Sequence, residues 1–513
     1  MPAPGLWRTL LCMDTRPHPD KLEGEPQSAS PSVRSDNARP RERAALSTWR
    51  RLGSRLHSRF ARQIALIAVG IGTFAAAGHF IGGMIGWWHA YEITFGGPPS
   101  ATPVPSKSSA SRADVQSLVL LPLVDESEQR EGDWFADGLT SDLTAELSRM
   151  PSTLVISSYT ARSYKGKAAD PRDVAKELAV RYVVHGHARR VGERVVLELQ
   201  MVDGESGLQT WSQRVDLDRS RLADGLGDVA LQLARSLNVQ TYRSSGGKAV
   251  VLKPHEVQAD DLAMQGWAAW FRGVTPENVR EAASLFDQAV QRDPRSTRAL
   301  GGVAFAYRLG SQFGWLPERE AAMRKAEEAA ERLRGIDESD FFTLLARESI
   351  ATGHGDWVSL LAIADTMLER FPSHAPSLGY RAMAMTGLGR FEECIGAAKQ
   401  ALRIGPRDTL VGGWNVMIAI CHFMRAEYVQ AEEFARVAWQ AGPRLPLPPL
   451  TLAASLHREG RVDEARKIAD EYRFRSPEFR LAHLEQRLMM GTEPRLVEGR
   501  QRMIDSLRAL GVP

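Results

Sequence analysis

The apolar positions of this chain change their spacing several times, and each change marks a different kind of segment. A run of 25 residues, Ile64–Trp88, contains no Lys, Arg, Asp or Glu. About 20 apolar residues are enough to cross the hydrocarbon core of a bilayer. The run therefore predicts one transmembrane helix, which we place at residues 63–90. A cleaved signal peptide is the competing interpretation, but its apolar region normally spans only about 7–15 residues.

The residues that flank this run predict its orientation. Arginines crowd its N-terminal side at Arg50, Arg51, Arg55, Arg59 and Arg62. On the other side no Lys or Arg occurs before Lys107. Basic residues mark the cytoplasmic end of a span, so we expect a bacterial inner-membrane protein with residues 1–62 in the cytoplasm and its bulk in the periplasm. The basic arm would also attract anionic lipid.

Glycines within the apolar run suggest a contact between helices. Gly78, Gly82 and Gly86 recur every four residues and would share one helix face. Small residues at this spacing allow two membrane helices to approach closely, which predicts a homodimer at this face. The alternative is that glycine is simply common in membrane helices. The span would then act only as a tether rather than transmit a signal.

Two segments lack any apolar period. Residues 1–62 are rich in Pro, Ser and Arg, a composition that cannot bury enough apolar surface to fold, so we expect disorder. Residues 91–114 contain the stretch GGPPSATPVPSKSSAS, which is typical of a Pro/Ser linker. Neither segment carries a catalytic or DNA-binding pattern.

Short apolar runs alternate with helix-like spacing over residues 115–241. We expect strands at 118–124, 153–157, 182–190, 194–202 and 209–215, and helices at 134–150, from 170 onwards and at 222–237. Helices interleaved with strands and followed by a three-strand meander predict a two-layer α/β sandwich.

Four motifs in this region follow one another in a characteristic order. They are WFADGLTSDL (Trp134–Leu143), YKGK (Tyr164–Lys167), ELAVRYV (Glu177–Val183) and DGESGLQTW (Asp203–Trp211). Together they resemble the TolB amino-terminal-like domain of bacterial membrane signalling proteins. The resemblance implies a domain placed between a membrane span and tetratricopeptide repeats, with an adenylate cyclase or a winged-helix regulator on the cytoplasmic side. Residues 1–62 contain neither module, so the output activity of the family is not carried over.

The sequence departs from that family pattern at two pairs of positions. Leu123 and Asp125 stand where the family tends to have Phe and Asn, and His185 and His187 replace its commoner acidic and small residues. The two imidazoles share one strand face, a spacing that can chelate a metal. Because no third ligand lies nearby in the sequence, we expect exposed strand histidines and no metal site.

From residue 259 to residue 513 a helical motif recurs, after a linker at 242–258. Ala431 and Ala465 lie 34 residues apart, and so do Pro443 and Pro477. This is the tetratricopeptide period, in which small residues let two helices pack closely. About six repeats, with Leu481–Leu510 as a polar closing helix, predict an all-α solenoid.

The first helices of such repeats line a groove. Aligning the repeats on their terminal prolines assigns seven residues to it: Phe305, Arg308, Met383, Ile420, Phe423, His457 and Arg458. An apolar and basic groove suits a helix or an extended segment of a protein partner. The alternative is that the Met and aromatic side chains pack between repeats in the core.

Charge, cysteine content and the lack of cofactor motifs limit the classes of function that the chain could have. The chain has 65 Lys and Arg against 62 Asp and Glu, so bulk charge gives no argument for nucleic acid. Cys394 and Cys421 are expected as buried thiols, although a bridge between them stays open. No phosphate-binding loop or other cofactor motif occurs. Asp137 and Asp142, at the start of a predicted helix, are interpreted as capping groups.

These patterns favour a non-enzymatic, membrane-anchored scaffold or signal-sensing protein. Its periplasmic solenoid would bind a protein partner, and it would need neither cofactor nor metal. The alternative is a truncated or accessory subunit of an adenylate- or guanylate-cyclase-type signalling protein.

Overall fold

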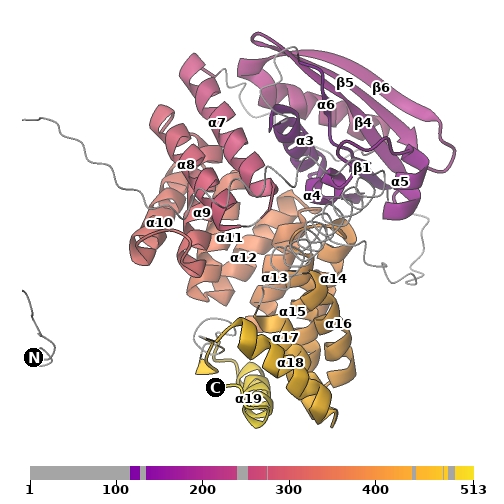
Figure 1. The fold of residues 1–513 in the computed structure, drawn as a ribbon. Helices are drawn as coiled ribbons and strands as arrows, with labels where there is room; N and C mark the ends of the chain where they lie inside the picture. Colours follow the sequence, from indigo (N-terminus) through magenta and orange to yellow (C-terminus); the bar gives the residue numbers. More distant parts are fainter. Residues whose placement is uncertain are drawn as a thin grey trace, which may run out of the picture. The chain divides into compact units, whose positions relative to one another are not determined.

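A computed structural model of the chain describes residues 116–513, except for 128–133, 238, 240–251, 274, 442–445, 478, 483 and 485–490. Gly96–Pro513 group into one compact unit. An α/β domain in this unit precedes a long array of helix pairs (Figure 1). The predicted arm (1–62), span (63–90), linker (91–114) and glycine face (Gly78, Gly82 and Gly86) lie outside the described residues.

The prediction of a single-pass membrane protein is corrected by this structure. Within the described part of the chain, no helix is both long enough and apolar enough to cross a bilayer. Several of the helices are instead amphipathic and bury one face against their neighbours. In α10 (Arg319–Ile336), for example, the buried residues are four alanines and one leucine, and the other face is largely charged. The fold class is a small sheet region followed by a helical-repeat region.

One mixed sheet forms the centre of the α/β domain. Its strands are β1 (Gln116–Leu120), β2 (Val124–Asp125), β3 (Thr153–Val155), β4 (Tyr182–Val191), β5 (Arg194–Asp203) and β6 (Gln209–Asp218). The strand order is β3-β1-β4-β5-β6, and β2 pairs with β4. β1 runs parallel to both β3 and β4, whereas β4, β5 and β6 form an antiparallel meander. The meander agrees with the pattern of the sequence.

Helices cover the two faces of this sheet unequally. α3 (Trp134–Leu147) and α6 (Leu222–Ser236) pack over one face, on a core that includes Leu118 and Leu197. α4 (Ser158–Arg162) and α5 (Pro171–Leu178) cover the opposite face near β1 and β4, where Val119 and Val183 point. Successive residues of a strand point to opposite faces. The two-layer sandwich that we predicted therefore has a third layer at one side.

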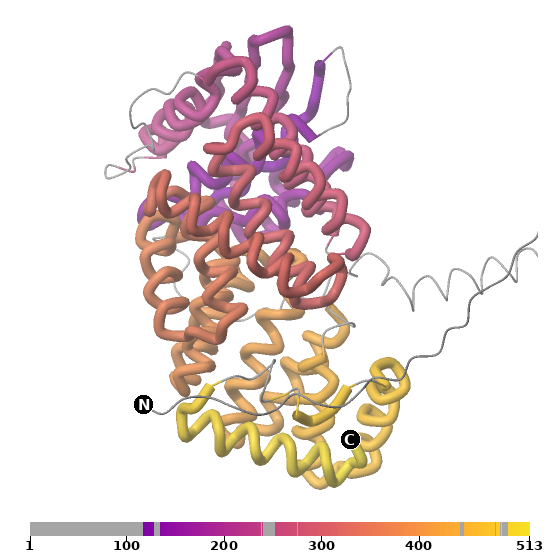
Figure 2. The backbone as a smooth tube through the Cα atoms, turned by 90° about the vertical axis from the view of Figure 1, so that its left-hand side faces the viewer, coloured from indigo at the N-terminus to yellow at the C-terminus, as the bar shows by residue number. Residues whose placement is uncertain are grey.

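The helical region consists of consecutive helix pairs. The helices are α7 (Pro254–Phe271), α8 (Pro276–Arg292), α9 (Thr297–Phe313), α10, α11 (Phe341–His354), α12 (Trp357–Arg370), α13 (Ala375–Gly387), α14 (Phe391–Ile404), α15 (Val411–Met424), α16 (Tyr428–Ala441), α17 (Leu447–Arg458), α18 (Val462–Arg475) and α19 (Pro494–Ala509). Figure 2 shows the pairs stacked one after another, with α19 at the end of the stack. The predicted helical-repeat region is confirmed, and it begins at Pro254, before the expected start at residue 259.

Glycine makes close helix packing possible in the first two pairs. Gly266 of α7 and Gly302 of α9 both face the ring of Phe286 in α8, and a Cβ atom at either position would overlap that ring. Because both neighbours lack a side chain there, the ring fills the space between three helices. This is the role that small residues have in repeat arrays.

Candidate binding cavity between the two regions

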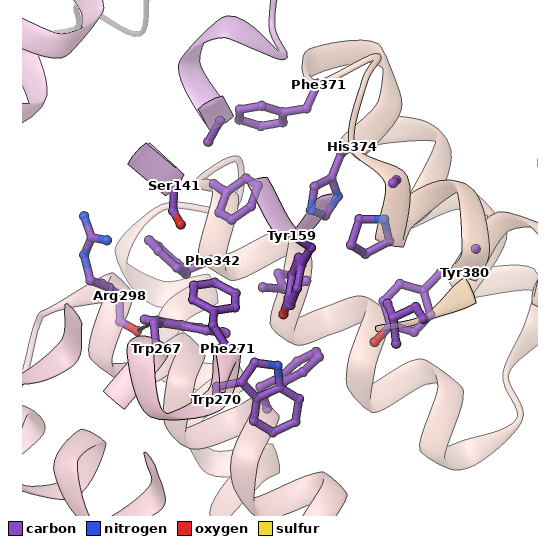
Figure 3. A pocket seen from close by; sticks show the side chains of 18 of the residues that line it. Ser141, Tyr159, Trp267, Trp270, Phe271, Arg298, Phe342, Phe371, His374 and Tyr380 are labelled. Atoms are coloured by element: carbon purple, nitrogen blue, oxygen red, sulfur yellow. Dashed lines mark hydrogen bonds between the residues drawn. The ribbon is translucent and has the colours of Figure 1, made fainter. Parts of the chain in front are cut away.

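The first helices of the pairs border a cavity of about 1990 Å³. Side chains from α7, α9, α11, α13 and α15 line it, and α3 and α4 of the α/β domain contribute to the same wall. Its lining is rich in aromatic rings, among them Tyr159, Trp267, Trp270, Phe271, Phe342, Phe371, His374 and Tyr380 (Figure 3). The cavity therefore lies where the solenoid meets the α/β domain.

The aromatic rings contact one another edge to face. Tyr159 of α4 meets Phe271 of α7 with ring centroids 4.7 Å apart and an interplanar angle of 87°. Trp270 meets Phe305 in the same manner at 4.8 Å. Edge-to-face pairs are favoured because the positive edge of one ring faces the negative face of the other. The wall is thus held together by ring contacts, one of which joins the two regions of the molecule.

A buried arginine interrupts this apolar wall. Arg308 of α9 is only 6% exposed. Its Nη1 donates to Oε1 of Gln312 at 2.7 Å, while its Nε is buried without an acceptor. Burial lowers the pKa of the Arg308 guanidinium. No carboxylate of the described residues forms an ion pair with it, so its positive charge is uncompensated within that part of the chain.

A second polar cluster lies beside the cavity, between α11 and α13. The Ser377 hydroxyl donates to Oε2 of Glu348 at 2.8 Å, and Nδ1 of His374 lies 2.8 Å from the same hydroxyl. Burial raises the pKa of Glu348 to about 8 and lowers the pKa of His374 to about 3. Although a serine, a histidine and a carboxylate meet here, Ser377 is fully buried between the other two groups. A substrate has no access to it, so the arrangement does not meet the needs of a nucleophile.

The structure brings together four of the seven residues that we assigned to the groove. Phe305, Arg308, Met383 and Ile420 all line the cavity. Their role in binding a partner stays a prediction.

The other three groove residues lie elsewhere. Phe423 is fully buried and packs on Tyr428 in the core around α15 and α16. His457 and Arg458 end α17, where Nη2 of Arg458 donates to the carbonyl of Arg502 in α19. A repeat period places a residue on the first helix, but it does not say whether its side chain faces the groove or the next repeat.

One set of ion pairs joins the α/β domain to the first two helix pairs. Arg298 of α9 donates to both carboxylate oxygens of Asp142 in α3, each at 2.8 Å, and to Asp260 of α7 at 2.8 Å. Arg219, which is 1% exposed, bonds to Asp260 at 3.0 Å and to Asp261 at 2.5 Å. We call these five residues the charged contact.

The charged contact shifts the pKa values of its members. Burial alone would raise the pKa of Asp260, but the guanidinium groups of Arg298 and Arg219 outweigh it and hold that pKa below its usual value. Burial alone would lower the pKa of Arg298, but Asp142 and Asp260 outweigh it and raise that pKa. Bidentate arginine–carboxylate pairs of this kind are strong and specific in geometry.

A second set of hydrogen bonds joins the α/β domain to later helix pairs. Oγ of Ser373 accepts the N–H of Val155 at 3.1 Å and donates to the carbonyl of Thr153 at 3.0 Å. The N–H of Ser157 donates to the carbonyl of Ile404 at 3.0 Å, and the Ser157 hydroxyl donates to Oδ2 of Asp408 at 3.3 Å. We call Ser373, Ser157 and Asp408, with these partners, the polar contact. Burial raises the pKa of Asp408 to about 7.

Sequence reasoning missed both contacts. Asp142 was interpreted as a capping group, yet its partner Arg298 is 156 residues away. Asp137, interpreted in the same way, forms ion pairs with Arg162 at 3.2 Å and Lys165 at 2.9 Å. A carboxylate at a helix start looks the same in the sequence whether it caps the helix or pairs with a distant arginine.

The two strand histidines differ in their surroundings. Nδ1 of His187 lies 2.9 Å from Oε1 of Glu126. Burial, followed by the proximity of His187, lowers the pKa of His185. A search of the described residues finds no group of three or more potential ligands placed to hold an ion.

Comparisons with known proteins reach only part of the chain. No family model matches the sequence. A protein of Rhizobium meliloti (strain 1021) described as "Putative adenylate cyclase 3" is 29% identical over 194 residues, which are 37% of this chain and 32% of that protein. The match therefore spans about a third of the length of that relative.

A solved structure of Pseudomonas aeruginosa PilF aligns with 44% of this chain and 96% of its own. Its TM-score of 0.35 and sequence identity of 14% are too low to support an argument. The chain is thus related over part of its length to a protein described as a cyclase, and it carries a helical-repeat array. The resemblance to the TolB amino-terminal-like domain stays a prediction.

Proposed function

We propose that this chain is a non-enzymatic scaffold or signal-sensing protein whose solenoid binds a segment of a protein partner in the aromatic cavity. The size and lining of the cavity support this proposal. Its volume of about 1990 Å³ exceeds the roughly 300–1000 Å³ of typical small-molecule pockets. An extended segment or a helix of a partner fits such a space, and rings on neighbouring first helices can receive its apolar side chains.

The α/β domain gives this scaffold a second element. In our proposal it is the sensing part, a role that fits its resemblance to the TolB amino-terminal-like domain. Because it forms part of the cavity wall through α3 and α4, a change in its position would alter the space offered to a partner. Two separate contacts, the charged and the polar, hold it against the solenoid.

The proposal is tested by a pair of phenylalanine substitutions. Phe305 lines the cavity, whereas Phe474 of α18 is 89% exposed and does not line it. Partners are captured by crosslinking to the purified chain and identified by mass spectrometry. Phe305→Ala should reduce the yield of a specific partner about tenfold, as expected for loss of an aromatic anchor, while Phe474→Ala should leave it unchanged.

The thermal midpoints of both variants are measured beside the wild type. A loss of partner without a matching loss of folded protein assigns the effect to the cavity. Equal capture by the two variants would place the binding surface elsewhere and refute the proposal.

A second candidate is an accessory subunit of a cyclase-type signalling system. The 29% identity to the Rhizobium meliloti protein over 194 residues favours it. Formation of cyclic nucleotide from ATP or GTP by the purified chain would replace the non-enzymatic proposal. A change in the activity of a separate cyclase, produced only when this chain is added, would support the accessory role.

A further inference from the structure

Arg308 differs from two other arginines that line the cavity. Arg298 and Arg219 each bond to two carboxylates. Arg308 has a neutral partner, Gln312, and forms no ion pair with any carboxylate of the described residues. An unpaired charge is unfavourable in a buried place. Buried charges in proteins are therefore usually paired with a charge of opposite sign. The missing counter-charge points to an anionic group from outside the described residues.

The side chains around Arg308 indicate which other chemical groups the anionic ligand would contain. Phe305 lies one turn earlier on α9, and Tyr380 and Met383 line the cavity from α13. Burial raises the pKa of the Tyr380 phenol to about 12, so at neutral pH it keeps its proton and can donate a hydrogen bond. A ligand with one charged head group and a predominantly apolar body matches this lining.

The α/β domain limits the kind of molecule that fits beside Arg308. Tyr159 of α4 lines the same cavity as Tyr380 (Figure 3). The charged and polar contacts hold α3 and α4 in place. The cavity around Arg308 is therefore bounded by both regions of this chain, and a flexible apolar tail can extend from it among the aromatic rings.

We propose that the cavity contains a site for a small amphipathic carboxylate, with its head on Arg308 and its tail among the aromatic rings. Arginine binds a carboxylate through parallel N–H donors, which makes this head group the natural partner of a guanidinium. The site adds a small-molecule ligand to the proposed scaffold and does not depend on partner binding. A bound tail would contact Tyr159 as well as the solenoid, so occupancy would also stabilise the docked α/β domain.

The test compares two probes that differ only in the head group. Dodecanoate and dodecanol are titrated into the full chain below their aggregation limits, and affinity is measured by calorimetry and by the thermal midpoint. Dodecanoate should bind, and dodecanol about tenfold or more weakly, because a hydrogen bond to a charged group is lost. Arg308→Gln should remove this preference, lowering the affinity for dodecanoate to that for dodecanol.

Controls separate the site from nonspecific binding and from misfolding. Arg324→Gln changes an exposed arginine of α10 that does not line the cavity, and it should leave dodecanoate binding unaltered. Arg308→Met keeps the apolar stem without the charge, and it should fold as stably as the wild type while losing the preference for dodecanoate.

Three results would overturn the proposal. They are equal affinity of the wild type for both probes, an undiminished preference in Arg308→Gln, and no binding of octanoate, dodecanoate or hexadecanoate to the wild type. Loss of a captured protein partner in Arg308→Gln, with carboxylate binding unchanged, would instead assign Arg308 to the scaffold function.

Discussion

The charged contact and the polar contact hold the same α/β domain by different means. At the first two helix pairs, Arg298 and Arg219 form ion pairs with three aspartates. At the later pairs, hydroxyl groups and backbone groups form the bonds, and the one carboxylate, Asp408, has no arginine partner among the described residues. The first contact depends on ionised groups, whereas the second is strongest when its carboxyl group is neutral.

This difference gives the two contacts opposite responses to pH. The pKa of Asp260 is lower in the folded protein than in the unfolded chain, so its contribution is present above about 3.8 and is lost as the pH falls through the folded value. The pKa of Asp408 is raised to about 7, so its contribution is complete below about 3.8 and is lost as the pH rises through 7. The two contributions overlap most fully near pH 4, so the docked domain should be held most firmly there.

The largest effect is expected from Arg298→Met. The substitution leaves Asp142 without its bidentate partner and Asp260 with only Arg219. Breaking a buried ion pair by removing one member costs about 3–5 kcal/mol. Denaturant unfolding at pH 7 should report this loss, and hydrogen exchange should show that the amides of α3 become less protected.

The matched control is Arg292→Met. Arg292 is exposed and donates to Gln258 at 2.9 Å, so its loss should change stability by no more than about 0.5 kcal/mol. Equal losses in the two variants would show that the charged contact adds nothing beyond an ordinary surface arginine.

The next effect is that of Asp408→Asn, and its magnitude depends on pH. Asparagine cannot ionise, so the variant avoids the cost of a carboxylate in this buried place. A pKa change from 3.8 to about 7 corresponds to about 4 kcal/mol at most. The variant should be more stable than the wild type at pH 8, and the advantage should shrink steadily towards pH 4.

Unfolding curves at a series of pH values measure this difference. Asp463→Asn, an exposed position on α18, should change stability by no more than about 0.5 kcal/mol at each pH. A constant difference between Asp408→Asn and the wild type across the series would contradict the opposed pH responses of the two contacts.

The smallest of the three effects is expected from Ser373→Ala. The hydroxyl group is the acceptor for the buried N–H of Val155 and the donor to Thr153. Leaving a buried donor unsatisfied costs about 1–3 kcal/mol. Because no charge is involved, the loss should not vary with salt, unlike that of Arg298→Met. Ser359→Ala, at an exposed position, serves as the control.

The sequence allowed much of the fold to be predicted, because regular spacing identifies long elements. The meander of β4, β5 and β6 and the helix pairs around Ala431 and Ala465 followed from their periods. The single turn of α4 was missed, since five residues are too few to show a period. The order β3-β1-β4 also escaped prediction, because a parallel pairing leaves no local signal.

The candidate site was harder to predict for the same physical reason. Four groove residues were found because the repeat period marks the first helices. Phe423 was misplaced beside them because a ring in the core and a ring in the groove obey the same period. The contacts that place the α/β domain beside the cavity join distant residues, since Ser157 and Asp408 of the polar contact are 251 residues apart. Only the folded structure shows which charges meet and that Arg308 has no carboxylate partner among the described residues.

The hydrogen bonds of Ser373 have a consequence for the protein during its synthesis. β3 is an edge strand, and an unpaired edge can recruit a strand from another chain. The hydroxyl group that covers Val155 and Thr153 is 218 and 220 residues further along the chain. At roughly 5–20 residues per second, a ribosome needs about 10 to 45 seconds to add that many residues. Throughout this interval the emerging α/β domain presents an uncovered strand edge. On crowded polysomes, or when chaperones are scarce, the unfinished chain should therefore aggregate more readily than the finished protein.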